Sequence, residues 1–445
     1  MKKKILFSFA AAVIVSGCST TGELKTECKT NTVVLSAEQE KQLEKSPILK
    51  ADEIVPAILL KGANYQVDPV VMTDGFLMQF KIKSDFGDFE ASSPATLNDR
   101  IFEISALAQL EKISKTEAFI KGMKHSLVEF GIDVKDLVTS PIDSITGIPA
   151  GIGRFFQRTY LTTTTGLDRI GNSGGENDLC GSGKTLPGKN KSYVKNDSNA
   201  VMATANATGK VAINLLGYFD QRRMLAKKLQ VDPYTTNAAL AQALDDTAWA
   251  SFAGGLGITA LKMAAPATMA INMTSRISSW VWDMPPGEMR VFNEKTLLAM
   301  GVSQEKTDHL LSHRMYTLTL QGRLVRALNR FPKSSGQEQV MDLALTVESH
   351  LQAQFIVESV EVLANYHASK QFITKIEAAE TVAGYTKAGG VVVPAPVSYL
   401  SWNKRLNIFS VKNTFKGKKK TILLTGQITS RAKKELEGFG WVVSQ

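Results

Sequence analysis

A helical pattern of apolar residues runs with few interruptions from Thr208 to Ser369 and commits the middle of the chain to packed helices. It is carried by the stretches GKVAINLLGYFDQRRMLAKKLQ, NAALAQALDDTAWASFAGG and QEQVMDLALTVESHLQAQFIVESVEVLANYHA, where apolar residues recur every three or four positions. This spacing places the apolar side chains on one helix face, which must be buried against a neighbour. The run DMPPG at residues 283–287 breaks the pattern. We therefore predict a body of several helices over residues 207–370.

Strand-like patterns flank this body on both sides. Before it, NYQVDPVVM and GFLMQFKIKS stand on either side of Asp74-Gly75, which is typical of a β-hairpin. Helices are expected near 36–46, 49–62 and 96–113, so residues 37–160 form a predicted α+β region. After the body, residues 371–445 contain the strand-like runs ITKIE, GGVVVPAPV, RLNIFSVK and KTILLTG, then the helical run SRAKKELEGFG and a last strand WVV.

The order of these patterns predicts the fold class. We expect an α+β protein with a mainly helical body, a small N-terminal β-hairpin region and a small C-terminal sheet subdomain covered by one C-terminal helix. The chain has 445 residues, of which 44% are hydrophobic, 21% charged and 8% aromatic. These values exclude wholesale disorder, collagen and coiled coil.

The N-terminus has the three parts of an export signal. Lysines 2–4 are followed by the apolar run ILFSFAAAVIV at residues 5–15 and then by Val15-Ser16-Gly17-Cys18. The apolar run is too short for a membrane-spanning helix, which needs about 20 residues. We expect cleavage after residue 17 and a short tether over residues 18–36, rich in Thr, Lys and Glu.

The signal resembles the lipobox of bacterial lipoproteins. The resemblance implies that Cys18 carries a diacylglycerol thioether and a fatty acyl chain such as palmitate on its new amine, which together anchor a protein stably. Ser19 replaces the aspartate typical of inner-membrane retention, so the resemblance implies the outer membrane in a Gram-negative host, with the body on the periplasmic or surface side. The alternative is a soluble secreted protein in which Cys18 is incidental.

Export limits the remaining chemistry. The formal charge of +10 falls to about +7 once the three signal lysines are removed. Nucleotide chemistry and nucleic-acid binding are disfavoured outside the cytoplasm, and no cofactor is expected. Cys28 and Cys180 are a candidate disulfide, whose loop of about 150 residues would stabilise the fold by about 4 to 5 kcal/mol. The alternative is two free thiols.

A glycine-rich segment over residues 161–206 has almost no large apolar residues, which favours a mobile loop or a boundary between subdomains. It contains Ser173 within GNSGG, a pattern that fits the nucleophile elbow of hydrolases. The flanking sequences lack the strand and helix that an elbow requires. Ser173 is therefore kept as a candidate nucleophile, beside the reading that this is a chance match in a glycine-rich loop.

Two further features suggest alternative functions. His309 and His313 are four residues apart in a predicted helix, so both could face one metal ion, although the glutamate of the metalloprotease motif is replaced by Leu310. A solvated histidine pair is the other interpretation. Residues 250–273 carry Lys262 as their only charge and could insert into a membrane, although this composition is also typical of a buried core segment.

A basic run near the C-terminus is the candidate for binding anions or a partner. It contains no acidic residue between positions 404 and 420 and comprises Lys404, Arg405, Lys412, Lys416, Lys418, Lys419 and Lys420. Such a cluster could contact anionic lipid headgroups, lipopolysaccharide phosphates or an acidic protein, at about 1 kcal/mol per charge near a membrane. The alternative is a solvated hairpin turn at NTFKGKKKT.

Three segments of the body, DGFLMQFKIKSDFGDFEASSPATL, LQVDPYTTNAALAQAL and WVWDMPPGEMR, resemble a family of uncharacterised exported bacterial proteins. This resemblance implies secretion and adds no chemistry. The sequence as a whole predicts an envelope lipoprotein with a non-enzymatic binding or assembly role. The alternatives are an envelope hydrolase that uses Ser173 or a His309/His313 metal site, and a membrane-inserting, toxin-like protein that uses residues 250–273.

Overall fold

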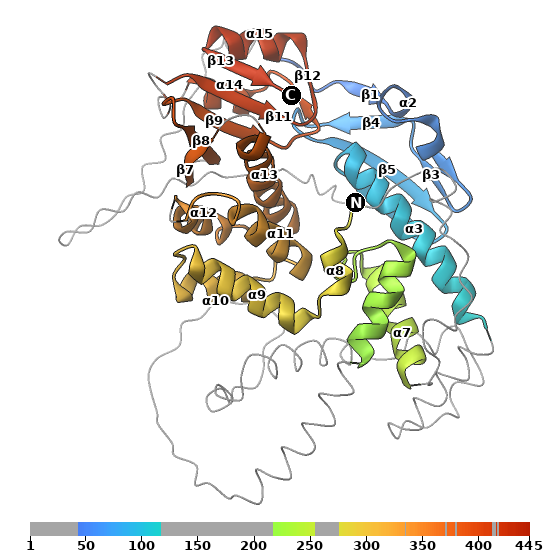
Figure 1. Cartoon of the computed structure of the whole chain (residues 1–445). Coiled ribbons are helices and arrows are strands. Elements are labelled where there is room, and N and C mark those ends of the chain that lie inside the picture. Colours follow the sequence, from blue (N-terminus) through green and yellow to red (C-terminus); the bar gives the residue numbers. More distant parts are fainter. Residues whose placement is uncertain are drawn as a thin grey trace, which may run out of the picture.

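The computed structural model shows helices in the central part of the chain and a sheet in each terminal region, which confirms the α+β class (Figure 1). It describes residues 43–116, 217–253, 276–333, 335–369, 372–378, 381–411, 415 and 418–445. Within these ranges, no helix is long and apolar enough to cross a membrane.

The N-terminal sheet is antiparallel and contains the predicted hairpin. Strands β4 and β5 pair Thr73 with Met78 across a tight turn. The Asp74 carboxylate closes this turn by accepting hydrogen bonds from the backbone N–H groups of Phe76 and Leu77. The strands are β1 (Ile48–Lys50), β2 (Lys61–Gly62), β3 (Tyr65–Val67), β4 (Val70–Thr73), β5 (Met78–Ser84) and β6 (Gly87–Ala91). Their order is β1-β4-β5-β3-β2, and β6 also pairs with β5.

The prediction of a helix over residues 49–62 is wrong. Only a single turn, α2 (Ala51–Ile54), and a 3-10 turn, η1 (Ala57–Leu59), form there. Pro56 separates the two turns, and both ends of the segment pair as strands β1 and β2, so sheet pairing overrides the local helical pattern. In the patch expected near 36–46, the four described residues, 43–46, are not helical.

Helix α3 (Pro94–Ser114) covers the N-terminal sheet and confirms the helix predicted over 96–113. Ser93 and Thr96 form a reciprocal capping box, and Pro94 occupies the first helical turn, where it costs no hydrogen bond. One face of α3 packs Leu97 and Ile101 against the sheet, and another packs Leu110 against helix 217–229 and α7 (Ala238–Ala253). Helix α3 is therefore shared by two hydrophobic cores.

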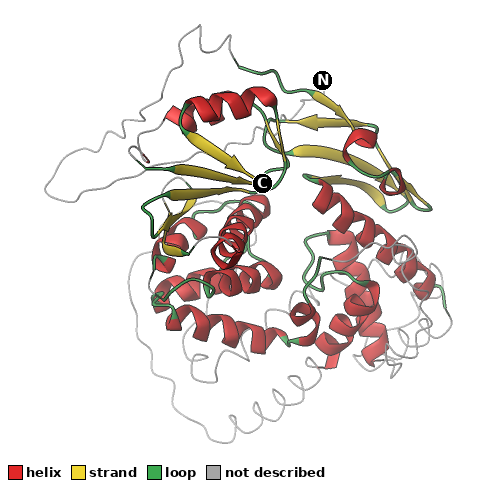
Figure 2. Cartoon of the chain, turned by 45° about the horizontal axis from the view of Figure 1, so that its top comes forward, coloured by secondary structure: helices red, strands yellow, loops and turns green. Residues whose placement is uncertain are grey.

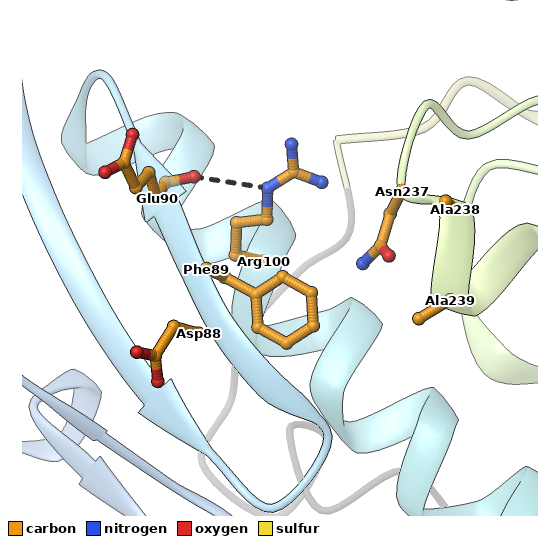
Figure 3. Close-up of a pocket in the computed structure, with 7 residues that line it drawn as sticks. All are labelled: Asp88, Phe89, Glu90, Arg100, Asn237, Ala238 and Ala239. Carbon is orange, nitrogen blue, oxygen red and sulfur yellow. Dashed lines mark hydrogen bonds between the residues drawn. The ribbon is translucent and has the colours of Figure 1, made fainter. Parts of the chain in front are cut away.

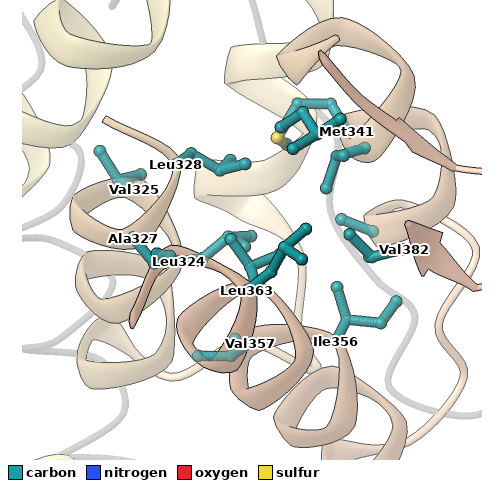
Figure 4. Close-up of a cluster of buried hydrophobic side chains, with 14 of the residues drawn as sticks. Leu324, Val325, Ala327, Leu328, Met341, Ile356, Val357, Leu363 and Val382 are labelled. Carbon is teal, nitrogen blue, oxygen red and sulfur yellow. The ribbon is translucent and has the colours of Figure 1, made fainter. Parts of the chain in front are cut away.

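The helical body continues through α8 (Ser279–Asp283), α9 (Pro286–Ala299), α10 (Gln304–Ser312), α11 (Leu318–Leu328), α12 (Gln337–Ala344) and α13 (His350–Ser369). The predicted break at 283–287 is confirmed, because α8 ends at Asp283 and Pro286 starts α9. In the largest core, Leu324 and Leu328 of α11 lie with Val357 and Leu363 of α13 (Figure 4).

The C-terminal sheet is mixed, with the order β13-β11-β9-β8-β7. Its strands are β7 (Ile373–Ala378), β8 (Val382–Thr386), β9 (Val391–Ala395), β11 (Lys420–Leu424) and β13 (Trp441–Ser444). The last three are parallel, whereas β7, β8 and β9 pair antiparallel. A short parallel pair, β10 (Tyr399–Leu400) and β12 (Gln427–Ile428), lies beyond β9 and β11 in the chain.

Two helices, rather than the single one expected, connect the parallel strands and pack on one face of this sheet. The run RLNIFSVK, predicted as a strand, forms α14 (Lys404–Val411), and α15 (Ser430–Gly438) is the helix that was expected. The Asn403 side chain accepts a hydrogen bond from the Leu406 N–H and caps α14. A strand is excluded here because β9 and β11 are parallel, and parallel neighbours need a crossover between them. Helix α13 packs against the other face.

The two sheets dock directly onto each other although they come from opposite ends of the chain (Figure 2). The backbone N–H groups of Tyr399 and Ser401 donate to the carbonyls of Phe76 and Gly75, at 3.0 and 3.1 Å. Thus the β4–β5 turn pairs with the segment that follows β9. The N-terminal and C-terminal regions form one continuous structure above the helical body.

Candidate functional site

Several predicted site residues lie outside the described residues. These are Cys18, Cys28, Ser173, Cys180, Lys412 and Lys416. Of the segment 250–273, only 250–253 is described; it ends α7, where Ala250 and Ser251 are buried. The predictions for these residues therefore stay predictions.

The two histidines do not share one helix. His309 is exposed on α10, whereas His313 follows the last helical residue, Ser312, because the backbone leaves the helical conformation there. The His313 ring packs edge-on against Tyr316, with 5.5 Å between ring centroids, and its Nδ1 accepts a hydrogen bond from the Met315 N–H. In the described ranges, no group of three or more His, Cys, Asp or Glu side chains could hold a metal ion.

The second half of the basic run lies at one end of the C-terminal sheet. Lys418 and Lys419 are exposed and lead into Lys420, the first residue of β11. The stretch NTFKGKKKT is therefore not the hairpin turn of the alternative reading, because it connects α14 to a strand that runs parallel to β9. Lys404 and Arg405, in contrast, are the first two residues of α14.

Strand pairing brings two more lysines to the same end. The Val391 N–H at the start of β9 donates to the Lys419 carbonyl at 2.8 Å, so the β8–β9 turn with exposed Lys387 lies beside the start of β11. On the other side of β8, Lys375 of β7 pairs with Tyr385. We call this surface the basic rim and define it by its five members, Lys375, Lys387, Lys418, Lys419 and Lys420.

Aromatic rings hold three members of the basic rim in place. The Nζ atoms of Lys418 and Lys375 lie 4.1 and 5.9 Å from the centroid of the Tyr385 ring. The Nζ of Lys420 lies 5.0 Å from the Trp441 ring and also donates to the Phe439 carbonyl at 2.6 Å. These contacts fix the ammonium groups without cancelling their charge.

The Tyr385 phenol stays neutral beside these lysines. Burial, assisted by a hydrogen bond to Glu377, raises the pKa of Tyr385 to about 12. Between described residues, the rim lysines form one ion pair, in which a carboxylate oxygen of Glu377 lies 3.8 Å from the Nζ of Lys375. The Tyr385 phenol therefore adds no negative charge to the basic rim at physiological pH.

Sequence reasoning found Lys418, Lys419 and Lys420 but missed Lys375 and Lys387. The first three form a contiguous run, which is visible without any structure. The other two are isolated in the sequence and join the rim only through the antiparallel register of β7, β8 and β9. The sequence shows that both lysines lie in or beside strand-like runs, but it does not show the order of these strands in the sheet.

A second polar region lies where α3 meets the loop before α7. Glu103 is buried there, and its carboxylate accepts hydrogen bonds from Arg100, Thr235 and Asn237 at 2.5, 2.7 and 3.0 Å. An open hollow of about 400 Å³ lies beside it (Figure 3), lined by Asp88, Phe89, Glu90, Arg100, Asn237, Ala238 and Ala239. Because these central polar groups bind one another, the geometry favours a structural role for this junction.

The same junction continues toward the helical body through ion pairs. Arg276 lies 3.1 Å from Asp99 of α3 and 3.8 Å from Glu358 of α13. Desolvation raises the pKa of Asp99 to about 6, with Arg276 acting in the opposite direction. Arg323 of α11 forms a two-pronged hydrogen bond with Glu361 at 2.9 and 2.6 Å. These pairs join α3 to α11 and α13.

Comparisons of the chain with protein-family models, with curated proteins and with solved structures found no match.

Proposed function

We propose that the protein is a lipid-anchored lipoprotein of the bacterial envelope, held at the outer membrane through Cys18, and that its folded body has a non-enzymatic binding or assembly role. The signal and Cys18 in the sequence support the anchor. The basic rim supports the binding role and is the contact surface of this proposal.

One observation carries the binding role: within the described part of the chain, the five rim lysines form one ion pair with a carboxylate, between Lys375 and Glu377. The Nζ atoms of Lys375, Lys418 and Lys420 lie over aromatic rings, so a partner has to order fewer flexible side chains. The junction around Glu103 is built the opposite way, because there cations and carboxylates satisfy each other. A surface with unbalanced, preordered charge suits recognition of an anionic envelope component.

The test is crosslinking in intact cells, followed by mass spectrometry of the captured proteins. It compares the native chain, a Cys18→Ser form, and a rim form that carries Lys387→Glu, Lys418→Glu and Lys419→Glu. Three exposed lysines elsewhere supply the matched control with the same change of charge: Lys61→Glu, Lys112→Glu and Lys295→Glu.

The proposal expects a small set of captured envelope components that requires both the anchor and the rim. Charge reversal at the rim should lower their recovery at least tenfold, while the matched control keeps it. Equal recovery from the rim form and the control would refute binding of a captured protein by the rim. Full recovery from the Cys18→Ser form would refute the anchor.

A further inference from the structure

The basic rim extends across the whole width of the C-terminal sheet and has an exposed phenylalanine at each end. Phe372 immediately precedes β7 and is 57% exposed, and Phe439 precedes β13 and is 38% exposed. β7 and β13 are the two edge strands of the five-stranded sheet. With neighbouring strands about 4.8 Å apart, the rim spans about 19 Å from one phenylalanine to the other.

We call this row of side chains along one end of the sheet the ridge. Its lysines lie near the start of β7, in the β8–β9 turn and at the start of β11, and the two phenylalanines precede β7 and β13; all these positions are at the same end of the sheet. Neighbouring strands end side by side, so the lysines and the two phenylalanines form one row. The Phe439 ring stacks on Trp402, with 6.0 Å between ring centroids, and the Phe372 ring packs on His367 at 4.6 Å, but both keep part of their surface exposed. A ridge fits a flat surface better than it fits a peptide or a small ligand, which require a concavity.

The chemistry of the ridge matches the headgroup region of a lipid bilayer. Lysines bind anionic headgroups and keep their charge in water while their stems cross apolar surroundings. Exposed aromatic side chains enter the boundary between headgroups and acyl chains. An acidic protein partner would account for the lysines but not for the exposed apolar surface of Phe372 at one end of the row and of Phe439 at the other.

We propose that the basic rim docks the folded body onto an anionic phospholipid surface, with the lysines on headgroup phosphates and Phe372 and Phe439 at the headgroup–acyl boundary. This inference rests on the proposed function, because it names the partner of the same surface. The lipid anchor then holds the protein near the membrane, and the rim sets the orientation of the body on it.

Sedimentation with lipid vesicles tests this inference. The protein is the chain from Ser19 onward, which contains every described residue and lacks the acylated cysteine. The probes are vesicles of phosphatidylcholine alone and vesicles of phosphatidylcholine mixed with phosphatidylglycerol. Inorganic phosphate at matched ionic strength is added as a competitor to separate recognition of a lipid surface from binding of free phosphate.

The rim variant carries Lys387→Gln, Lys418→Gln and Lys419→Gln, and the matched control carries Lys61→Gln, Lys112→Gln and Lys295→Gln. Each lysine near an anionic surface is worth about fivefold in affinity, so the rim variant should bind the anionic vesicles about 100-fold more weakly. Phe372→Ser should weaken binding by a further measurable factor with no change of charge. The control should stay within threefold of the unmodified chain, and inorganic phosphate should not compete.

Three results would overturn the inference: equal binding to both vesicle types, equal binding by rim variant and control, or full competition by inorganic phosphate. If vesicle binding is absent but the rim still governs crosslinking in cells, the lipid assignment fails and the proposed function stands. If neither assay depends on the rim, both fail. Unfolding midpoints of all variants check that the substitutions, which lie on exposed side chains, leave the fold intact.

Discussion

The Ser398 hydroxyl forms hydrogen bonds to two segments of the N-terminal region, so its removal should destabilise the docking of the two sheets by more than the loss of a single hydrogen bond. Its Oγ accepts a hydrogen bond from the Met78 N–H at 2.7 Å and donates to the Ser92 carbonyl at 2.9 Å. The residue is 8% exposed, so water cannot readily replace either partner. Ser398→Ala therefore removes the partner of the buried Met78 N–H and of the half-buried Ser92 carbonyl.

Each unsatisfied buried group costs about 1 to 3 kcal/mol, so we expect Ser398→Ala to destabilise the docked sheets by about 2 to 4 kcal/mol. Ser410→Ala is the matched control. Ser410 is also buried, but its Oγ donates only to the Asn407 carbonyl one helical turn earlier, and its loss should cost less than about 1 kcal/mol.

The hydrogen-exchange rate of the Met78 amide measures the opening of this contact directly, because that N–H is the donor to Ser398. An opening made easier by about 3 kcal/mol exchanges roughly 150-fold faster. Chemical denaturation supplies the global value. If the Met78 amide exchanges at the same rate in Ser398→Ala and in Ser410→Ala, the argument that this hydroxyl couples the two sheets is refuted.

Four further variants test local contacts and one shifted pKa. Gly336→Ala should destabilise the fold by about 3 kcal/mol or more in urea unfolding, because its φ is +117° and an added Cβ would lie 1.8 Å from the Ile376 carbonyl oxygen. Gly389→Ala, whose φ is +79° in open space, should cost only about 1 to 2 kcal/mol, and equal costs would contradict the steric argument. Glu103→Ala should cost about 3 to 5 kcal/mol, because it leaves three donors facing a buried gap; a loss below 1 kcal/mol would show that water replaces the carboxylate. Desolvation raises the pKa of Asp246 to about 7, above the ordinary value near 3.9, so its contribution to stability falls as pH rises through this interval. Asp246→Asn should therefore flatten the decline in thermal midpoint between pH 5 and pH 8, and an unchanged pH profile would contradict the assignment.

Local patterns predicted the elements that local interactions decide. The β4–β5 turn at Asp74-Gly75 and the helix beginning near Pro94 have their signals in a few adjacent residues, and both are confirmed. The break before Pro286 is confirmed for the same reason. These positions need no information from distant parts of the chain.

The failures occurred where pairing partners decided the outcome. The run RLNIFSVK resembles a strand by its apolar content, but Leu406 and Ser410 are buried four residues apart on a helix because β9 and β11 need a crossover. The segment 49–62 became strands at its ends because β4 and β3 accept them as neighbours. Lys375 and Lys387 were missed for the same reason: the order of strands in the sheet, which places them at the candidate site, cannot be predicted from a single sequence.

The docking of the β4–β5 turn onto the segment after β9 also determines when, during synthesis, the native fold can form. Met78 and Ser398 are 320 residues apart, and a chain grows by about 5 to 20 residues per second during synthesis. The N-terminal hairpin must therefore wait roughly 15 to 60 seconds before its partner exists. Closing a loop of that length costs about 5 kcal/mol in chain entropy. Packing of the helical body offsets this cost, because it brings the two sheets together before they dock. Native assembly is thus a late event, and a growing chain remains open for most of its synthesis.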